Sequence, residues 1–335
     1  MTVINLKKLG SIQQLASVRR IQYQDSRAGG MNAVQVHAGP LQFVTALDKC
    51  LDITGVTYKG INLTFLSKPG LQNRQSYDTH GQEAQRSIMG GLFFTCGTDN
   101  VGTPDEANAL PMHGTLRSTP ADHVCTDAWW DGDDYRIRIS GEMRQAALFG
   151  ENILLRRTIE TVLCSNGSAD TITLHDEFTN EAYSQTPFML LYHCNIGYPL
   201  LDAGSQVHIP ALSTCLRGED HATSLPWDRI EEPVDNLPEQ VFFHKVCPDA
   251  EGLVTIGVHN PSLSLGLDIT YRQDQLPRLT QWKSMASGDY VVGLEPCNCH
   301  VDGQVWEREN GTLEMLRPGE KKCVDLIFKV IEKCV

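Results

Sequence analysis

Three polar residues lie inside apolar, strand-like segments of the sequence, and their types could supply acid–base chemistry. His113 lies within residues 110–117, His193 within 188–195 and Glu295 within 290–296. Burying an imidazole or a carboxylate among aliphatic side chains is costly unless the group is paired or hydrogen-bonded. One acid and one base in a common site are what proton transfer on a sugar or a similar polyol requires.

Each of these residues also has a structural interpretation. His113 fits a surface loop between two prolines, and His193 fits a hydrogen-bonded histidine of the core. Glu295 precedes a proline at the end of an aliphatic stretch, where an exposed loop glutamate is the alternative to a functional carboxylate. Because histidine titrates near neutral pH and can donate a proton, we select His193 as the leading candidate.

Two arginines near these segments are candidates for ligand binding. Arg86 precedes the double glycine Gly90-Gly91, and Arg117 follows His113 by four residues. A guanidinium presents a fixed fork of donors that suits vicinal hydroxyls and carboxylates. A pair of glycines permits a close backbone approach or an unusual turn. We therefore expect this region to present hydrogen-bond donors to a ligand.

The elements that must position these residues are predicted to be strands. Apolar and polar residues alternate with a period of two, which is typical of half-buried antiparallel strands. Segments with this pattern are 41–47, 61–66, 135–140, 153–159, 171–178 and 263–271. Helical pattern is sparse, apart from a short helix over 11–18 capped by Ser11. Asn310-Gly311 predicts a hairpin between 305–308 and 312–316. The sequence thus predicts an all-β fold, a large antiparallel β-sandwich with few short helices.

The size and charge of the chain exclude several classes of partner. We interpret the 335 residues as a single domain, 1–335, with residues 1–35 as an N-terminal extension packing on it. The formal net charge of −13 argues against nucleic acid and against an anionic membrane surface. No apolar run approaches the ~20 residues that cross a bilayer, and the first residues lack the apolar core of a signal peptide.

The eleven cysteines are scattered along the chain and predict free thiols in a reducing compartment, so a cytoplasmic location is expected. The spacing Cys297-Asn298-Cys299-His300 is unlike the usual zinc pairs, and Cys323 is the only nearby candidate partner. We therefore expect no metal site. No phosphate-binding glycine motif is present either, and no cofactor is predicted.

Several short stretches together resemble the aldose 1-epimerases, or galactose mutarotase-like proteins, and most closely their DUF4432 branch. The matching stretches follow in order along most of the chain, at 51–53 with 58–60, 90–97, 112–121, 192–202 and 293–296. The resemblance implies the galactose mutarotase-like supersandwich, with a sugar bound in a cleft on one concave sheet.

The resemblance also implies roles for the candidate residues. Glu295 would be the general base that takes the proton of the anomeric hydroxyl, and His193 the general acid that protonates the ring oxygen. The ring would open, the aldehyde would rotate, and the ring would close as the other anomer. His113 would polarise the ring oxygen. Arg86 and Arg117 would hold hydroxyls or an anionic substituent, and which arginine faces the cleft is left open.

The sequence departs from the better-known members in one position. The aspartate that usually binds sugar hydroxyls has no secure match, and His259 or His244 is its candidate replacement. Trp282 fits either a platform for a sugar face or a core tryptophan. The expected partner is a monosaccharide or sugar acid, and the chain is expected to be a monomer or homodimer.

Two alternatives remain beside the 1-epimerase. They are a non-catalytic carbohydrate-binding or sensing protein on the same scaffold, and a different sugar isomerase or lyase. A hydrolase is disfavoured because Glu295 has no evident carboxylate partner in the sequence.

Overall fold

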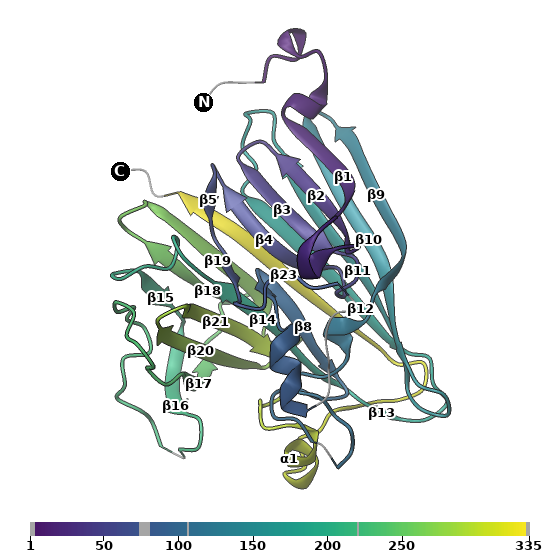
Figure 1. The fold of residues 1–335 in the computed structure, drawn as a ribbon, viewed down its shortest axis with the longest axis vertical. Coiled ribbons are helices and arrows are strands. Elements are labelled where there is room, and N and C mark those ends of the chain that lie inside the picture. The colour runs from purple at the N-terminus through teal and green to yellow at the C-terminus, as the bar shows by residue number, and fades with distance from the viewer. Residues whose placement is uncertain (1–3, 74–80, 106, 220, 333–335) are drawn as a thin grey trace.

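A computed structural model describes residues 4–73, 81–105, 107–219 and 221–332. Within these ranges the chain forms three large antiparallel sheets and two small two-stranded ones (Figure 1). The five-stranded sheet has the order β1 (Ala16–Gln22), β2 (Asn32–Ala38), β3 (Leu41–Ala46), β4 (Asp52–Tyr58), β5 (Ile61–Asn62). The six-stranded sheet has the order β16 (Ala211–Leu216), β17 (Gln240–Val246), β20 (Arg278–Ala286), β21 (Asp289–Cys297), β14 (Met189–Ile196), β8 (Phe93–Thr98).

The third large sheet provides the long strands behind the other two in Figure 1. Its eight strands follow the order β15 (Gln206–His208), β18 (Leu253–Asn260), β19 (Leu265–Arg272), β23 (Lys321–Glu332), β12 (Thr171–Asn180), β11 (Asn152–Leu163), β10 (Asp134–Ala146), β9 (Ala121–Asp131). The small sheets pair β13 (Thr186–Pro187) with β22 (Met315–Leu316), and β6 (Phe65–Leu66) with β7 (Gly90–Gly91).

Helical structure is confined to short pieces. The one α-helix in the described ranges is α1 (Gln304–Glu309). The 3-10 turns are η1 (Leu6–Lys8), η2 (Ile12–Gln14), η3 (Ser26–Ala28), η4 (Gly81–Ser87) and η5 (Leu116–Ser118). None of the helices in the part of the chain that is described has the length and apolar character needed to cross a membrane.

One continuous core joins the three large sheets. It includes Phe43 of the five-stranded sheet, Ile159 and Phe328 of the eight-stranded sheet, and Tyr192 and Leu294 of the six-stranded sheet. Each of these strands turns alternate residues inward, as the period of two requires. The prediction of an all-β antiparallel sandwich with few short helices is confirmed.

A buried ion pair ties the three sheets together at their junction. The Arg157 guanidinium donates to Asp52 at 2.7 Å, to Asp176 at 2.6 Å and to Thr95 at 2.9 Å. Asp52 belongs to the five-stranded sheet, Thr95 to the six-stranded sheet and the other two to the eight-stranded sheet. Arg157, Asp52 and Asp176 have fully buried side chains, and such a group is tolerable only when its hydrogen bonds are made.

Two local predictions near the ends of the chain differ from the structure. The predicted hairpin around Asn310-Gly311 is wrong, because residues 304–309 form α1 and Asn310 is its C-cap. Helix formation wins there because the fully buried Glu307 carboxylate accepts hydrogen bonds from His300 and Thr312. The predicted N-terminal helix shrinks to η2, although its cap at Ser11 is confirmed.

The segment over residues 1–35 was expected to be an extension that packs on the domain, and it also contributes strands to the fold. Its described part supplies β1 and the first residues of β2, which pair in the five-stranded sheet. The predicted strand over 61–66 is divided between β5 and β6, which belong to different sheets. Every cysteine in the described ranges is a free thiol, as predicted.

Candidate active site

A cavity of about 690 Å³ lies on the face of the six-stranded sheet that is turned away from the eight-stranded sheet. On β20, Thr280, Trp282, Ser284 and Ala286 line this pocket. Residues at alternate positions, such as Leu279, point into the core between the sheets. The alternation along each strand therefore decides which side chains can meet a ligand.

His193 of β14 and Glu295 of β21 meet at the floor of the pocket. His193 Nε2 lies 3.1 Å from Glu295 Oε1, and the two side chains are 9% and 2% exposed. Both residues line the pocket. The contact lacks the alignment of a hydrogen bond, and Oε1 has no hydrogen-bond partner among the described residues. A buried polar atom that lacks a hydrogen-bond partner and lies next to a cavity indicates that a ligand supplies the missing hydrogen bond.

Asn195 sets the orientation and tautomer of the His193 ring. Its Nδ2 donates to the carbonyl oxygens of His193 at 2.7 Å and Gly91 at 3.4 Å, so its Oδ1 must face the imidazole. His193 Nδ1 then donates to that oxygen at 2.8 Å. The neutral ring consequently presents the Nε2 lone pair on the Glu295 side. Phe94 stacks on the ring at a centroid distance of 4.4 Å and holds its plane.

Burial shifts the pKa values of the two groups in opposite directions. Burial lowers the pKa of His193 from 6.5 to about 4. Burial, with a smaller contribution from the charge of Glu239, raises the pKa of Glu295 well above its usual range. Both directions favour a neutral imidazole and a protonated carboxyl. Because the groups are in contact, their titration belongs to the pair.

His113 approaches the same point from a loop. Its backbone has a φ of 60°, a left-handed conformation that is uncommon for a non-glycine residue and is found at functional sites. Its ring centroid lies 5.4 Å from that of His193. Nδ1 accepts a hydrogen bond from the Gly102 N–H at 3.4 Å, so the neutral ring carries its proton on Nε2. Burial lowers the pKa of His113 well below 6.5, which makes it an uncharged donor.

Trp282 forms a side wall of the pocket beside His193. Its ring centroid lies 5.5 Å from that of His193, in an edge-to-face arrangement. The indole Nε1 donates to Glu239 Oε2 at 2.6 Å, which fixes the ring. Trp282 thus lines the pocket and does not belong to the core between the sheets, so its indole can contact a ligand there.

The other candidates for sugar binding lie elsewhere. Arg86 belongs to η4 with an exposed side chain, and it is the neighbouring Gln85 that lines the pocket. Arg117 is 3% exposed and donates to Ser87 Oγ at 3.0 Å and to the Ala84 carbonyl, so it joins η5 to η4 behind the pocket wall. Neither arginine is among the lining residues.

The two histidines considered as replacements for a sugar-binding aspartate are also outside the pocket. His244 points to the core side of β17, where it contacts Thr214 and Gln281 at 2.9 Å each. His259 lies on the eight-stranded sheet and contacts Asp268 at 2.7 Å. Both therefore have partners in the fold rather than a position at the pocket.

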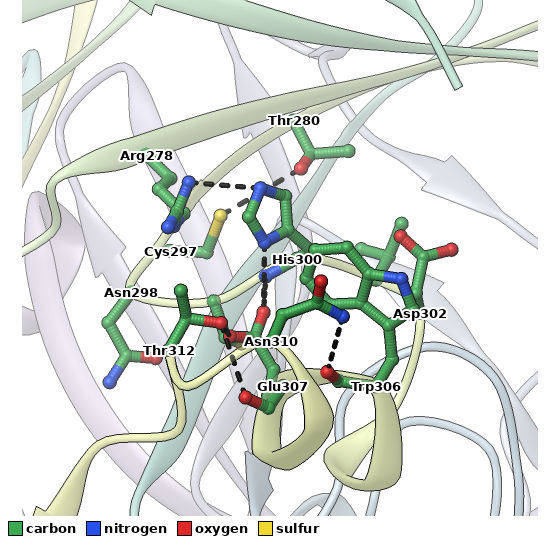
Figure 2. A network of polar contacts seen from close by, with 12 residues as sticks. Arg278, Thr280, Cys297, Asn298, His300, Asp302, Trp306, Glu307, Asn310 and Thr312 are labelled. Carbon is green, nitrogen blue, oxygen red and sulfur yellow. Dashed lines mark hydrogen bonds and ion pairs between the residues drawn. The ribbon is translucent and has the colours of Figure 1, made fainter. Parts of the chain in front are cut away.

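A polar network joins α1 to the first residue of β20 and to the segment that follows β21 (Figure 2). His300 Nδ1 contacts Glu307 Oε1 at 3.0 Å, and Arg278 donates to His300 Nε2 at 2.9 Å. These contacts anchor α1 to β20. They also engage the histidine of the Cys297–His300 stretch, and no cluster of three or more metal-ligand side chains occurs among the described residues.

The family model described as "Domain of unknown function (DUF4432)" matches residues 28–330. The chain belongs to the DUF4432 family. The resemblance stated from the short sequence stretches is confirmed by this match. A comparison with curated proteins found no match.

Solved structures show that this DUF4432 protein has the galactose mutarotase-like fold. A "putative aldose 1-epimerase" from Klebsiella pneumoniae superposes with a TM-score of 0.83 at 19% identity, over 96% of this chain and 88% of that one. The galactose 1-epimerase of Lactobacillus acidophilus superposes with a TM-score of 0.57 at 14% identity, over 95% and 100% of the two chains. At these identities the likeness establishes the fold alone.

Sequence reasoning missed four residues of the site in this DUF4432 protein. Asn195 orients His193, Glu239 fixes Trp282, and Gly293 leaves room for Glu295, since a Cβ there would lie 2.5 Å from Oε1. Arg217 lines the pocket and donates to Asp302 at 2.9 Å. Only Asn195 and Gly293 carried a local signal, because each stands two residues from a candidate, His193 or Glu295, and therefore on the same strand face.

Proposed function

We propose that this protein is a sugar 1-epimerase that interconverts the anomers of an aldose by acid–base ring opening. The observation that carries the proposal is the buried Glu295 Oε1, which lies 3.1 Å from His193 Nε2 beside the pocket and lacks a hydrogen-bond partner in the described ranges. An unpaired buried polar atom costs about 1–3 kcal/mol, and a sugar hydroxyl that donates to it would offset this cost.

In the proposed reaction Glu295 accepts the proton of the anomeric hydroxyl while His193 donates a proton from Nε2 to the ring oxygen. The bond between C1 and the ring oxygen breaks, and an open-chain aldehyde forms. Rotation about C1–C2 presents the other face of the carbonyl. On closure the former ring oxygen returns its proton to His193, and Glu295 protonates the new anomeric oxygen. His113 supplies a further uncharged donor from its Nε2–H.

Burial affects the two halves of this proton transfer in opposite ways. Ring opening moves the single proton of the pair from His193 to Glu295. Burial lowers the pKa of His193 to about 4 and raises that of Glu295, so this transfer runs toward the favoured state. The initial state, with an ionised carboxylate, requires stabilisation by donors on the bound sugar. Each positioned acid or base typically contributes ~10²–10⁴-fold to the rate.

The test is anomer exchange followed by NMR for a panel of aldoses and uronic acids. The wild-type protein is expected to accelerate exchange, and Glu295→Gln and His193→Asn are each expected to lose about 10²-fold or more. Glu177→Gln and His175→Asn make the same chemical changes on the outer face of the eight-stranded sheet and should retain the full rate. Variants at Glu295 and His193 that remain as fast as wild type would refute the proposal.

The alternative of a carbohydrate-binding protein has a separate outcome in the same experiment. A sugar that binds the wild-type protein without any acceleration of anomer exchange would favour that alternative. The pocket residues Trp282 and Glu239 provide an aromatic face and a carboxylate that would serve binding alone. The orphaned carboxyl oxygen beside an imidazole favours the enzyme.

A further inference from the structure

The pocket extends far beyond the His193–Glu295 pair in one direction along the sheet. Glu295 lies opposite Thr280 in the β20–β21 register, whereas Asp289 lies opposite Ala286 at the far end of the same two strands. All four residues line one continuous pocket. At about 3.3 Å per residue, the stretch from Thr280 to Ala286 covers about 20 Å. A single sugar ring reacting at Glu295 would leave most of this length unfilled.

The opposite end of the same face is blocked. Arg278 precedes Thr280 on the pocket side of β20, and it donates to His300 Nε2 at 2.9 Å (Figure 2). The His300 ring packs against Trp306 at 4.7 Å and Phe243 at 5.7 Å between centroids. These side chains cover the sheet immediately beyond Thr280. Along β20, a ligand whose reacting carbon lies at Glu295 can therefore extend toward Ala286. Across the sheet, the pocket also reaches Thr103, Arg217 and Val301.

We call the far part of the pocket the distal section and define it by six lining residues: Ser67, Lys68, Leu237, Ser284, Ala286 and Asp289. Lys68 Nζ forms an ion pair with Asp289 at 2.6 Å, so the two charges of this section compensate each other. Leu237 exposes 41% of its surface. The section thus combines apolar surface with hydroxyl groups and little net charge.

This chemistry suits a second sugar ring better than a phosphate. A phosphate is recognised by uncompensated cations, whereas a sugar offers hydroxyls together with apolar C–H faces. Trp282 stands on β20 between Thr280 and Ser284, where the two parts of the pocket meet. Its indole is fixed through Nε1 by Glu239 and can support a ring on either side of the junction.

We propose that the substrate is an oligosaccharide of at least two rings. The ring with the free anomeric carbon reacts at His193 and Glu295, and the next ring occupies the distal section. This inference rests on the proposed function, because it places the reducing-end ring at the pair that exchanges its anomers.

The test compares anomer exchange of monosaccharides with that of disaccharides that have the same reducing sugar. For the best disaccharide we expect kcat/KM to exceed that of its monosaccharide by at least about tenfold, equivalent to about 1.4 kcal/mol of transition-state binding. Ala286→Trp fills the distal section and should abolish this advantage. Thr173→Trp, on the outer face of the eight-stranded sheet, should retain it.

Binding to the Glu295→Gln variant, measured by calorimetry, separates the two proposals. If no sugar is accelerated but disaccharides bind this variant more tightly than monosaccharides, the distal site stands and the epimerase proposal fails. If monosaccharides are processed as efficiently as disaccharides, the distal site is overturned and the epimerase proposal stands. A preference for sugar phosphates, or cleavage of the disaccharide, also overturns it. The wild-type comparison decides the matter even if Ala286→Trp does not fold.

Discussion

Replacing His244 with glutamine is expected to remove an acid-sensitive part of the protein's stability. His244 Nε2 donates to Gln281 Oε1 at 2.9 Å, and Nδ1 accepts from the Thr214 hydroxyl at 2.9 Å. The Gln281 amide is oriented by its donation to the Trp227 carbonyl at 2.8 Å. Burial lowers the pKa of His244 from 6.5 to about 4, so the folded protein holds this ring neutral in mild acid.

The sign of the effect follows from proton binding by the two states. Above pH 6.5 both the folded and the unfolded chain carry a neutral ring. Between pH 6.5 and pH 4 the unfolded chain binds a proton that the folded chain does not, so the free energy of unfolding falls as the pH falls. This loss is about 2 kcal/mol at pH 5 and approaches about 3 kcal/mol below pH 4, at about 1.4 kcal/mol per pKa unit.

The assay is urea unfolding of wild type and His244→Gln at pH 7 and pH 5. Between these two conditions the variant should lose about 2 kcal/mol less of its unfolding free energy than wild type. His208→Gln, at an exposed position of β15, is the control and should behave as wild type. Equal losses in wild type and His244→Gln would refute the reasoning that this ring is buried and neutral. Retained anomer exchange in His244→Gln at pH 7 would separate this residue from the pocket.

Two further substitutions test the positions of buried groups. In Gly293→Ala the new Cβ would lie 2.5 Å from Glu295 Oε1, so the carboxyl should be displaced and anomer exchange should fall toward that of Glu295→Gln, with a stability loss of about 1–3 kcal/mol in urea unfolding. A fully active Gly293→Ala would contradict the assigned carboxyl position. Asp176→Asn removes one carboxylate from Arg157 and should cost about 3–5 kcal/mol of unfolding free energy, whereas a loss under about 1 kcal/mol would contradict the buried ion pair.

The fold was predictable because a half-buried strand has one apolar and one polar face, and these faces produce an alternation of apolar and polar residues in the sequence. The same rule decides much of the site. His193 and Asn195 share a face of β14, and both line the pocket. The rule fails at His244, because the residues 241–243 that precede it are apolar on both faces of β17. With no polar row to mark the outer face, the sequence could not tell that His244 points to the core.

The positions of the other residues depend on contacts between segments that are far apart in the sequence. Such contacts produce no local sequence pattern. Arg117 was selected because it stands near His113 in the sequence, but it holds η4 and η5 together. Arg217 directly follows β16, and it reaches the pocket because that strand pairs with β17. The turn signal at Asn310-Gly311 was outweighed by tertiary bonds to Glu307, which no local pattern encodes.

Burial of a charge alone does not separate a structural group from a functional one in this protein. Arg157 and Glu295 each expose only a few per cent of their surface to solvent. All the guanidinium nitrogens of Arg157 donate to protein oxygens, on Asp176, Asp52, Thr95 and the Cys50 carbonyl. Glu295 Oε1, in contrast, has no hydrogen-bond partner in the described part of the chain and borders a cavity. Because desolvation penalises both groups, the carboxyl oxygen that the fold leaves unbonded beside a cavity is the basis on which we propose Glu295, and not Arg157, as a catalytic residue.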